Sequence, residues 1–329
     1  RFGSDWRSDV CLPISGGIIW IDASGWNYGR LSDPQDPEYS YVKECDYISG
    51  AAMMIRHELW KEIGGFDERF VPAYCEDSDL AFEVSSHGNK VMLQPSSIVV
   101  HFDGISNGTD LSSGQKSYQV KNIEKFKEKW KDELEKQLKN AENVFVARDR
   151  SKNKKHILVI DHYVPQYDKD AGSRTVNQYL RLFASMGYSV SFIGDNFFRH
   201  EPYTSELQQQ GIEVLYGPYY ASNWKKWIDE NGKYFEYVLL NRPHISIKYI
   251  DYLKKNTNAK IMYYGHDLHF LRELREFELT GEDSLLKSSQ EWKEKELDLM
   301  NKSDIVLYPS EVEVKEVKKL DSSIDVRKL

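Results

Sequence analysis

The sequence predicts an α/β protein in two parts. In the second half of the chain, short apolar runs alternate with helical patterns, whereas the first half mixes short strands and helices with polar loops. Apolar strands that are separated by helices favour a parallel sheet covered on both faces, as in a Rossmann-like domain. The character of the chain changes between residues 140 and 155, and 329 residues suffice for two ordinary domains.

The elements expected in the first part are short. In chain order they are a strand at 17–21, a polar loop at 26–41, an apolar segment at 47–55, a helix at 56–63, a helix at 78–86, strands at 91–93 and 98–100, and a helix at 116–138. Gly64 and Gly65 end the helix at 56–63, because glycine readily adopts the backbone conformation that closes a helix.

Residues 147–154 are polar and lack periodicity, which indicates a linker between domains at 1–146 and 155–329. We interpret its basic run as a solvated tether, with contact to an acidic lipid surface as the alternative. Beyond it, strands are expected at 156–160, 189–193, 212–215, 237–240, 261–264 and 305–307, and helices at 173–186, 245–255 and 285–301.

Composition argues against several classes of protein. The net charge of −8 argues against a general nucleic-acid binder, and the 40% hydrophobic content argues against disorder. Cys11, Cys45 and Cys75 are widely spaced and form no disulfide framework, which favours a reducing compartment. No apolar run approaches the roughly 20 residues of a transmembrane segment. We therefore expect a cytoplasmic protein, with peripheral contact at the inner face of the membrane as an open alternative.

Three carboxylates lie within four residues of one another: Glu76, Asp77 and Asp79. They fall in the first turn of an expected helix, where the helix dipole favours negative charge, so capping is one interpretation. The other is a carboxylate base that deprotonates a hydroxyl group while its neighbour orients that group. His101 ends the apolar strand at 98–100, and imidazole is a common ligand of divalent metals, although a lone histidine is more often structural.

These residues belong to a longer pattern. It consists of Ser49-Gly50-Ala51-Ala52-Met53-Met54-Ile55-Arg56, Gly64-Gly65-Phe66-Asp67-Glu68, Glu76-Asp77-Ser78-Asp79-Leu80 and Val99-Val100-His101. In order, spacing and residue type, the pattern resembles the C-terminal half of a family 2 glycosyltransferase catalytic domain, which has the GT-A fold.

The resemblance implies inverting transfer of a sugar from a nucleotide-sugar to an acceptor hydroxyl. Asp77 would be the general base and Glu76 an acceptor-orienting acid, and Gly50, Ala51 and Asp79 would contact substrate. His101 would match a ligand of a divalent metal, Mn or Mg. Such domains carry an Asp-x-Asp metal motif in a preceding half, and the acids between Asp5 and Asp9 do not supply it. We therefore expect the donor site of this half to be incomplete.

Aromatic residues surround the polar loop of the first part: Trp20, Trp26, Tyr28 and Tyr47. Sugars stack their C–H faces on aromatic rings, so Trp26 in particular is a candidate for acceptor binding. Packing within the core or the loop explains the same residues equally well.

In the second part, Gly172 and Ser173 lie where a loop enters a helix, and free N–H groups there can bind an anion or a hydroxyl. His266 follows the strand at 261–264, so it is expected at the same edge of the sheet. The loop Asp170-Ala171-Gly172-Ser173, the turn Gly187-Tyr188-Ser189-Val190 and the segment 304–310 resemble the N-terminal Rossmann domain of a family 4-type GT-B glycosyltransferase. In that fold this domain meets the acceptor, and the resemblance implies that Gly172, Ser173 and His266 lie at the interdomain cleft. No cofactor is evident for this half.

Together these patterns favour an internal piece of a bifunctional bacterial glycosyltransferase, hexosyltransferase-like, that takes part in surface-polysaccharide synthesis. Its partners would be a nucleotide-sugar donor and a glycan or lipid-linked acceptor. We expect the 329 residues alone to be inactive. Two alternatives stay open: a non-catalytic glycan-binding scaffold, and a sugar nucleotidyltransferase or other nucleotide enzyme.

Overall fold

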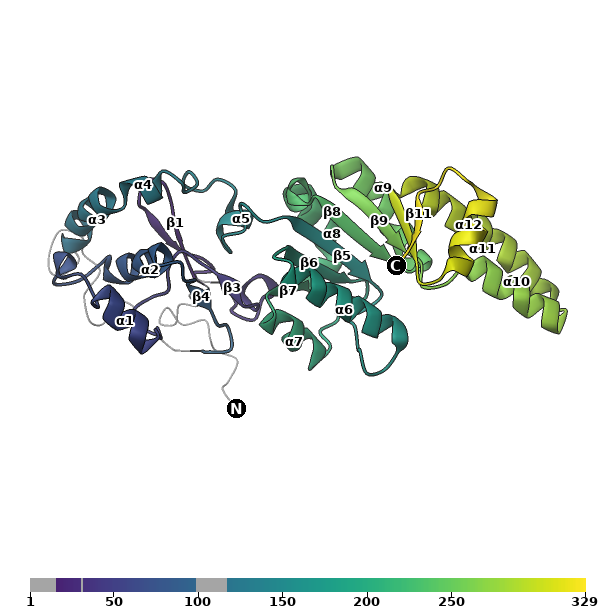
Figure 1. Ribbon diagram of the computed structural model, residues 1–329, viewed down its shortest axis with the longest axis horizontal. Helices are drawn as coiled ribbons and strands as arrows, with labels where there is room; N and C mark the ends of the chain where they lie inside the picture. The colour runs from purple at the N-terminus through teal and green to yellow at the C-terminus, as the bar shows by residue number, and fades with distance from the viewer. Residues whose placement is uncertain (1–15, 31, 99–116) are drawn as a thin grey trace. The chain divides into compact units, whose positions relative to one another are not determined.

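The computed structural model describes residues 16–30, 32–98 and 117–329. The chain divides into two compact units, a first unit of residues 1–153 and a second unit of residues 154–329. Figure 1 shows the elements of both units. Within the described ranges, none of the helices combines the length and the hydrophobicity that crossing a bilayer requires.

The second unit is an α/β domain around a seven-stranded parallel sheet with the strand order β11-β10-β9-β8-β5-β6-β7. The strands are β5 (His156–Asp161), β6 (Ser189–Gly194), β7 (Ile212–Leu215), β8 (Tyr237–Asn241), β9 (Lys260–Tyr264), β10 (Ile305–Tyr308) and β11 (Val326–Lys328). Every strand from β5 to β10 matches an expected one to within one or two residues. The prediction of a Rossmann-like α/β fold is thereby confirmed.

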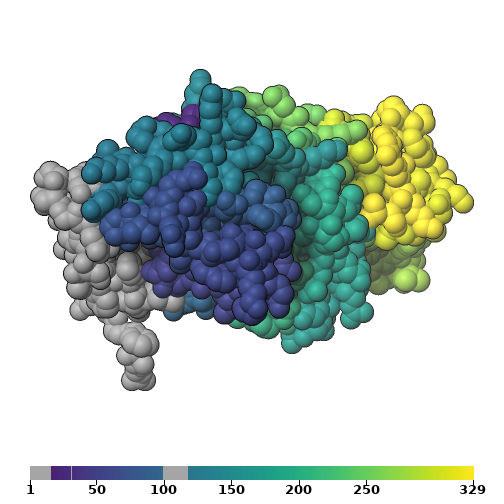
Figure 2. Space-filling model, turned by 60° about the vertical axis from the view of Figure 1, so that its left-hand side comes forward, coloured from purple at the N-terminus to yellow at the C-terminus, as the bar shows by residue number. Residues whose placement is uncertain are grey.

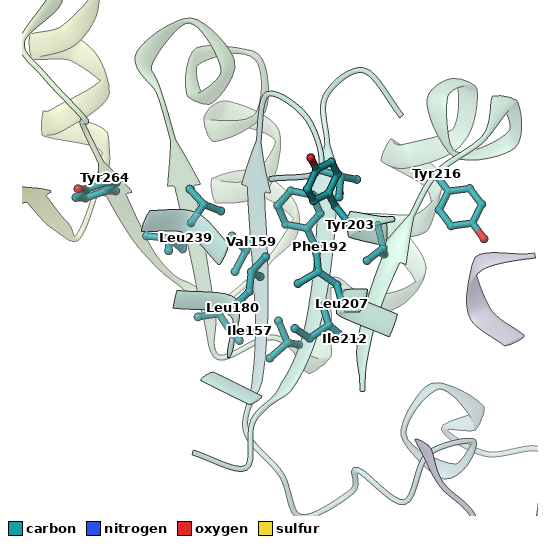
Figure 3. Close-up of a cluster of buried hydrophobic side chains, with 14 of the residues drawn as sticks. Ile157, Val159, Leu180, Phe192, Tyr203, Leu207, Ile212, Tyr216, Leu239 and Tyr264 are labelled. Atoms are coloured by element: carbon teal, nitrogen blue, oxygen red, sulfur yellow. The ribbon is translucent and has the colours of Figure 1, made fainter. Parts of the chain in front are cut away.

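Helices cover both faces of this sheet. They are α6 (Ala171–Ser185), α7 (Tyr203–Gln209), α8 (Pro218–Asn231), α9 (Pro243–Asn256), α10 (His269–Thr280), α11 (Asp283–Lys302) and α12 (Glu311–Leu320). In Figure 1, α6 and α7 lie on one face, whereas α8 and α9 lie on the other. Figure 3 shows the first of these interfaces, where Leu180 of α6 and Leu207 of α7 pack on Ile157 and Phe192 of the sheet. Because strands buried on both faces need apolar side chains throughout, their sequence signal is strong.

α10 and α11 form a hairpin that projects from the sheet in Figure 1. Its base is fixed by Glu296 of α11, which is fully buried. The carboxylate of Glu296 accepts hydrogen bonds from the backbone N–H groups of His269 and Phe270, each at 3.0 Å. Glu296 therefore caps the N-terminus of α10 in place of a local side chain.

The first unit is built of shorter elements. They are β1 (Gly17–Ile19), β2 (Gly25–Asn27), β3 (Lys43–Glu44), α1 (His57–Ile63), α2 (Glu76–Ser86), β4 (Met92–Leu93), α3 (Ser117–Lys129), α4 (Lys131–Leu134) and α5 (Val144–Ala147), together with 3₁₀ turns at Pro37–Tyr39 and Glu68–Phe70. In the described part, β1 pairs with β2 and β3 with β4, both antiparallel. Phe82 of α2 stacks edge-on against Phe126 of α3 and Trp130, so these helices form one core.

Two expectations for the first unit differ from the structure. The single helix expected at 116–138 is interrupted at Trp130, whose φ of −109° and ψ of 23° leave the helical range. The predicted tether at 147–154 is packed for its first half, because Arg148, Asp149 and Ser151 are buried. Arg150 completes this packing with a 2.6 Å ion pair to the buried Asp46. A sequence that is polar throughout gave no sign of these buried partners.

Candidate functional site

Asp77 lies in the first turn of α2 and is half-buried. Its Oδ2 atom accepts a 3.2 Å hydrogen bond from the backbone N–H of Gly50, and its Oδ1 atom accepts a 2.7 Å bond from the N–H of Ser78. The expected pair of Asp77 and Gly50 is thus in direct contact. Ala51 follows Gly50 on the exposed turn. Figure 2 shows the surface of this region, residues 48–92, in dark blue.

Asp77 also forms part of the wall of a pocket of about 370 Å³. Most of the other lining residues are apolar, and the lining is Ile48, Met53, Met54, Ile55, Arg56, Leu59, Leu80, Ala81, Val84, Asn89, Lys90, Val91 and Met92. A carboxylate at the wall of a pocket fits the role of a base that acts on a hydroxyl bound there.

Glu76 is half-buried beside Asp77. Its Oε2 atom is buried and has no hydrogen-bond partner among the residues that the structure describes. Burial, followed by the negative charge of Asp77, raises the pKa of Glu76 above its ordinary value. Glu76 therefore holds its proton to a higher pH than a solvated glutamate does.

The chain enters α2 through a strained turn. Tyr74 and Cys75 have φ values of 75° and 72°, a left-handed conformation that residues with a Cβ atom rarely adopt. Burial raises the pKa of the Cys75 thiol to about 12. Strained backbone often accompanies functional residues, and here it directly precedes Glu76 and Asp77.

Asp79 has a structural role, which corrects the expectation that it binds substrate. Its side chain is only 2% exposed. Oδ1 accepts a 2.7 Å hydrogen bond from Nε1 of Trp130, and Nζ of Lys129 lies 2.9 Å from Oδ2. Both carboxylate oxygens are engaged in joining α2 to the end of α3, so they are unavailable to a ligand.

Packing accounts for most of the aromatic surplus of the first unit. Trp20 is fully buried and Tyr47 is 8% exposed, with its hydroxyl group donating a 2.7 Å hydrogen bond to Asn27. Tyr28 packs edge-on against Tyr39 beside the buried Lys43. Trp26 differs, because 38% of its surface is exposed while its ring stacks edge-on on Trp20, with 5.0 Å between ring centroids. Trp26 is therefore the aromatic residue of this set that can meet a ligand.

The metal expectation finds no support within the part of the chain that the structure describes. His101 lies outside the described residues, and no group of three or more described His, Cys, Asp and Glu side chains is placed to hold a metal ion. Because the described residues form no such group, we derive no chemical step through a metal, and metal dependence stays a prediction.

In the second unit, polar residues gather at the carboxyl ends of β5, β8 and β9. Asp161 ends β5, is 1% exposed, and accepts a 2.8 Å hydrogen bond from Nε of Arg242. Arg242 follows β8 with a φ of 62° and lies 3.8 Å from Asp170. Sequence reasoning missed Asp161 and Arg242, because neither belongs to a recognisable motif.

Gly172 and His266 meet at this edge of the sheet, as their positions after parallel strands predict. A Cβ atom at position 172 would lie 3.3 Å from Cε1 of His266 and 2.8 Å from Nη2 of Arg242. Burial, followed by the charge of Arg242, lowers the pKa of His266 to about 4, so its imidazole is neutral at pH 7. Its Nε2 atom is buried and lacks a hydrogen-bond partner among the described residues.

Ser173 is fully buried and has a capping role. Its N–H and hydroxyl groups donate to the two carboxylate oxygens of Asp170, at 2.8 Å and 2.6 Å. Asp170 is the N-cap of α6, so the loop predicted to bind a ligand through Ser173 uses that residue to start the helix. This corrects the expectation for Ser173 and leaves Gly172 and His266 as the candidates.

A row of rings continues along the same edge. His162 lies 5.7 Å from His244, His244 lies 6.1 Å from His269, and His269 lies 5.2 Å from Trp292, measured between ring centroids. His162 and His244 are exposed. The row offers flat faces on which a sugar ring can stack.

Comparisons with known proteins are local. No protein-family model matches the chain. A stretch of 67 residues is 34% identical to the N-acetylglucosaminyl-diphospho-decaprenol L-rhamnosyltransferase of Mycobacterium tuberculosis, in strain CDC 1551 / Oshkosh and in strain H37Rv. The match covers 20% of this chain, and the chain spans only 22% of the length of these curated relatives.

Among solved structures, the sucrose-phosphate synthase of Thermosynechococcus elongatus aligns with a TM-score of 0.30 and 13% identity, over 53% of this chain and 87% of that chain. This structural likeness is too low to bear on function. The curated relatives are glycosyltransferases, and this agrees with the class of enzyme that the motifs of the first unit resemble.

Proposed function

We propose that this chain takes part in sugar transfer from nucleotide-sugar donors, and that Asp77 is the general base of the first unit. The observation that carries the proposal is the position of the Asp77 carboxylate, held by Gly50 at the wall of an apolar pocket. The local similarity to a rhamnosyltransferase supports the same class of reaction.

In the proposed reaction, a hydroxyl oxygen of the acceptor attacks the anomeric carbon of the donor sugar. The bond between that carbon and the phosphate oxygen breaks, and its electron pair leaves with the nucleoside diphosphate. The hydroxyl proton moves to the carboxylate of Asp77. Attack from the face opposite the leaving group inverts the anomeric centre, which is the outcome that the family 2 resemblance implies.

Two further residues would hold the acceptor. Glu76, half-buried beside Asp77, would orient the acceptor hydroxyl. Trp26 exposes a ring on which an acceptor sugar can stack. The acceptor class is a glycan or a lipid-linked sugar, since the name of the curated relative describes a sugar carried on a decaprenyl diphosphate.

For the second unit, we propose acceptor binding at the carboxyl edge of its sheet. The neutral imidazole of His266 can exchange hydrogen bonds with a sugar hydroxyl, and Gly172 leaves room for the close approach of Arg242 and His266. Together the two units would serve as a GT-A module and part of a GT-B module in bacterial surface-polysaccharide synthesis at the cytoplasmic side of the membrane.

The test measures transfer of a radiolabelled sugar by the natural protein, from a panel of nucleotide-sugars to glycan and lipid-diphosphate acceptors. We expect Asp77→Asn to lower kcat about 100-fold or more, because a carboxamide cannot accept the proton. Glu68→Gln is the matched control, since Glu68 is an exposed acid on a neighbouring turn. Equal activity of Asp77→Asn and wild type would reject the proposal and favour the glycan-binding alternative.

A further inference from the structure

A buried side-chain amide forms hydrogen bonds with the backbone of the turn that precedes Glu76 and Asp77. Asn122 lies on α3 and is fully buried. Its Nδ2 atom donates hydrogen bonds to the backbone carbonyl oxygens of Phe70 at 2.8 Å, Ala73 at 2.8 Å and Tyr74 at 3.1 Å. Since all three partners are carbonyl oxygens, the contacting atom must be the amide nitrogen, which is the donor.

The bonds from Asn122 end at the strained part of the turn. Tyr74, the last of the three acceptors, begins the pair of left-handed residues Tyr74 and Cys75. A left-handed conformation at two consecutive residues with Cβ atoms persists only where the surroundings impose it. The side chain of Cys75, the N-cap of α2, makes no capping hydrogen bond with the described residues, and the bonds from Asn122 are local restraints on the backbone that leads into Asp77.

A second restraint follows Asp77 and comes from the same part of the chain. Asp79 is held by Lys129 and Trp130 at the end of α3. The backbone is thus restrained on both sides of Asp77: before it at Tyr74, by Asn122, and after it at Asp79. Between these restraints, the carboxylate of Asp77 accepts a hydrogen bond from the N–H of Gly50. Of these contacts, the one from Asn122 sets the conformation of the backbone immediately before the two acids.

We infer that Asn122 is a positioning residue for Asp77: it holds the left-handed turn at Tyr74 and Cys75 so that the carboxylate of Asp77 stays at the pocket wall. This inference rests on the proposed role of Asp77 as the base. Asn122 itself contacts no substrate in this scheme. Its loss should lower kcat and leave donor binding unchanged, because the fault lies in the placement of the base.

Two measurements on the natural protein test the inference. The first is kcat and KM for sugar transfer. The second is the rate at which the Cys75 thiol reacts with an alkylating reagent, followed by mass spectrometry of the peptide that contains it. Cys75 is half-buried and sits inside the restrained turn, so its reaction rate reports the opening of the turn independently of any enzymatic activity.

The main variant is Asn122→Asp, which keeps the shape of the side chain and replaces the two N–H donors by at most one O–H donor. We expect a tenfold or greater fall in kcat, KM for the donor within twofold of wild type, and at least tenfold faster alkylation of Cys75. Asn122→Ser, whose shorter side chain does not span to the three carbonyl groups, should likewise lower kcat and speed the alkylation of Cys75, with KM for the donor again within twofold of wild type. Asn122→Ser replaces Asn122→Asp in the test if the latter variant fails to fold.

Two controls separate positioning from general destabilisation. Lys125 also bonds this region from α3, with Nζ 2.7 Å from the carbonyl oxygen of Arg69, but this hydrogen bond is exposed to solvent. Lys125→Ala should change neither kcat nor alkylation. Phe126→Leu removes core packing next to Asn122 and should lower Tm while leaving kcat and the Cys75 rate within twofold.

The inference is overturned if Asn122→Asp alters kcat no more than Phe126→Leu at an equal loss of Tm, or if Cys75 reacts at the wild-type rate. Faster alkylation with unchanged kcat, in a protein that Asp77→Asn inactivates, also overturns it, because the turn would then open without moving the base. If Asp77→Asn keeps its activity, the proposed function is wrong. This outcome can be told apart from a failure of the inference about Asn122, because the alkylation rate of Cys75 does not depend on enzymatic activity.

Discussion

Gly172 lies directly beneath the guanidinium group of Arg242, so closely that a Cβ atom at position 172 would be 2.8 Å from Nη2. Arg242 cannot retreat freely, because Asp161 holds its Nε at 2.8 Å and Asp170 lies 3.8 Å away. We expect Gly172→Ala to lower the free energy of unfolding of the second unit by about 1–3 kcal/mol, the usual cost of overpacking. Urea denaturation measures it.

A double-mutant cycle identifies the origin of that cost. If the clash with Arg242 causes it, Gly172→Ala should cost less in an Arg242→Ala background than in wild type. An equal cost in both backgrounds would place the strain elsewhere, for example at His266, whose Cε1 atom would lie 3.3 Å from the added Cβ.

Truncation of Asp79 should lower the free energy of unfolding more than truncation of Asp77, although the two residues are only two positions apart. Asp79→Ala leaves the indole N–H of Trp130 without its acceptor, so we expect a loss of about 1–3 kcal/mol in the free energy of unfolding. Lys129 keeps its ion pairs with Asp67 and Glu83 in this variant. Asp77→Ala should cost no more than about 1 kcal/mol, because its side chain is half-buried and makes only hydrogen bonds to backbone and neighbour.

Thermal and urea denaturation of the two variants provide the comparison. Similar stability losses for the two aspartates would contradict the division into a structural and a functional acid.

The free energy of unfolding of the second unit should decrease as the pH is lowered, because of His266. Its pKa is lowered to about 4 in the folded state, against an ordinary value of 6.5. Between these values the unfolded chain binds a proton that the folded chain does not, so protonation favours unfolding as the pH falls from about 6.5 to about 4. Above this window the imidazole is neutral in both states, and the effect vanishes.

His266→Gln isolates this contribution from that of the other groups that titrate nearby. Asp170, Asp267 and His269 lie within electrostatic reach of His266 and stay in place in the variant. We expect the free energy of unfolding of wild type, relative to His266→Gln, to decrease steadily from pH 6.5 to pH 4 in urea titrations. A constant difference between the two proteins would show that the folded imidazole takes up its proton normally.

The strands β5 to β10 of the second unit could be predicted from the sequence, whereas α7, α8, α10, α12 and β11 were not. A buried parallel strand needs an apolar residue at nearly every position, and Ile157, Leu158, Val159 and Ile160 satisfy this in a single run. The meeting of Gly172 and His266 followed from topology alone, since the carboxyl ends of parallel strands share one edge.

Residues such as Asn122 and Arg242 could not be predicted in this way. A buried asparagine in an amphipathic helix looks the same in the sequence as an exposed one, and its partners are carbonyl groups, which carry no sequence signal. Helix geometry does separate Asp77 from Asp79. Two residues along an α-helix turn by about 200°, so the two acids cannot face the same pocket.

Trp26 is the last residue whose role can be tested by a matched pair. Phe66 resembles it closely, because it is 47% exposed and stacks edge-on on Trp60 with ring centroids 5.2 Å apart, in the same unit. Loss of a stacking contact is worth about 1 kcal/mol, or roughly fivefold in binding. We therefore expect Trp26→Ala to raise KM for a glycan acceptor roughly fivefold, with kcat and Tm little changed, and Phe66→Ala to leave KM at the wild-type value. If Phe66→Ala raises KM as much as Trp26→Ala, exposed rings on this unit contribute nonspecifically, and Trp26 is not part of an acceptor site.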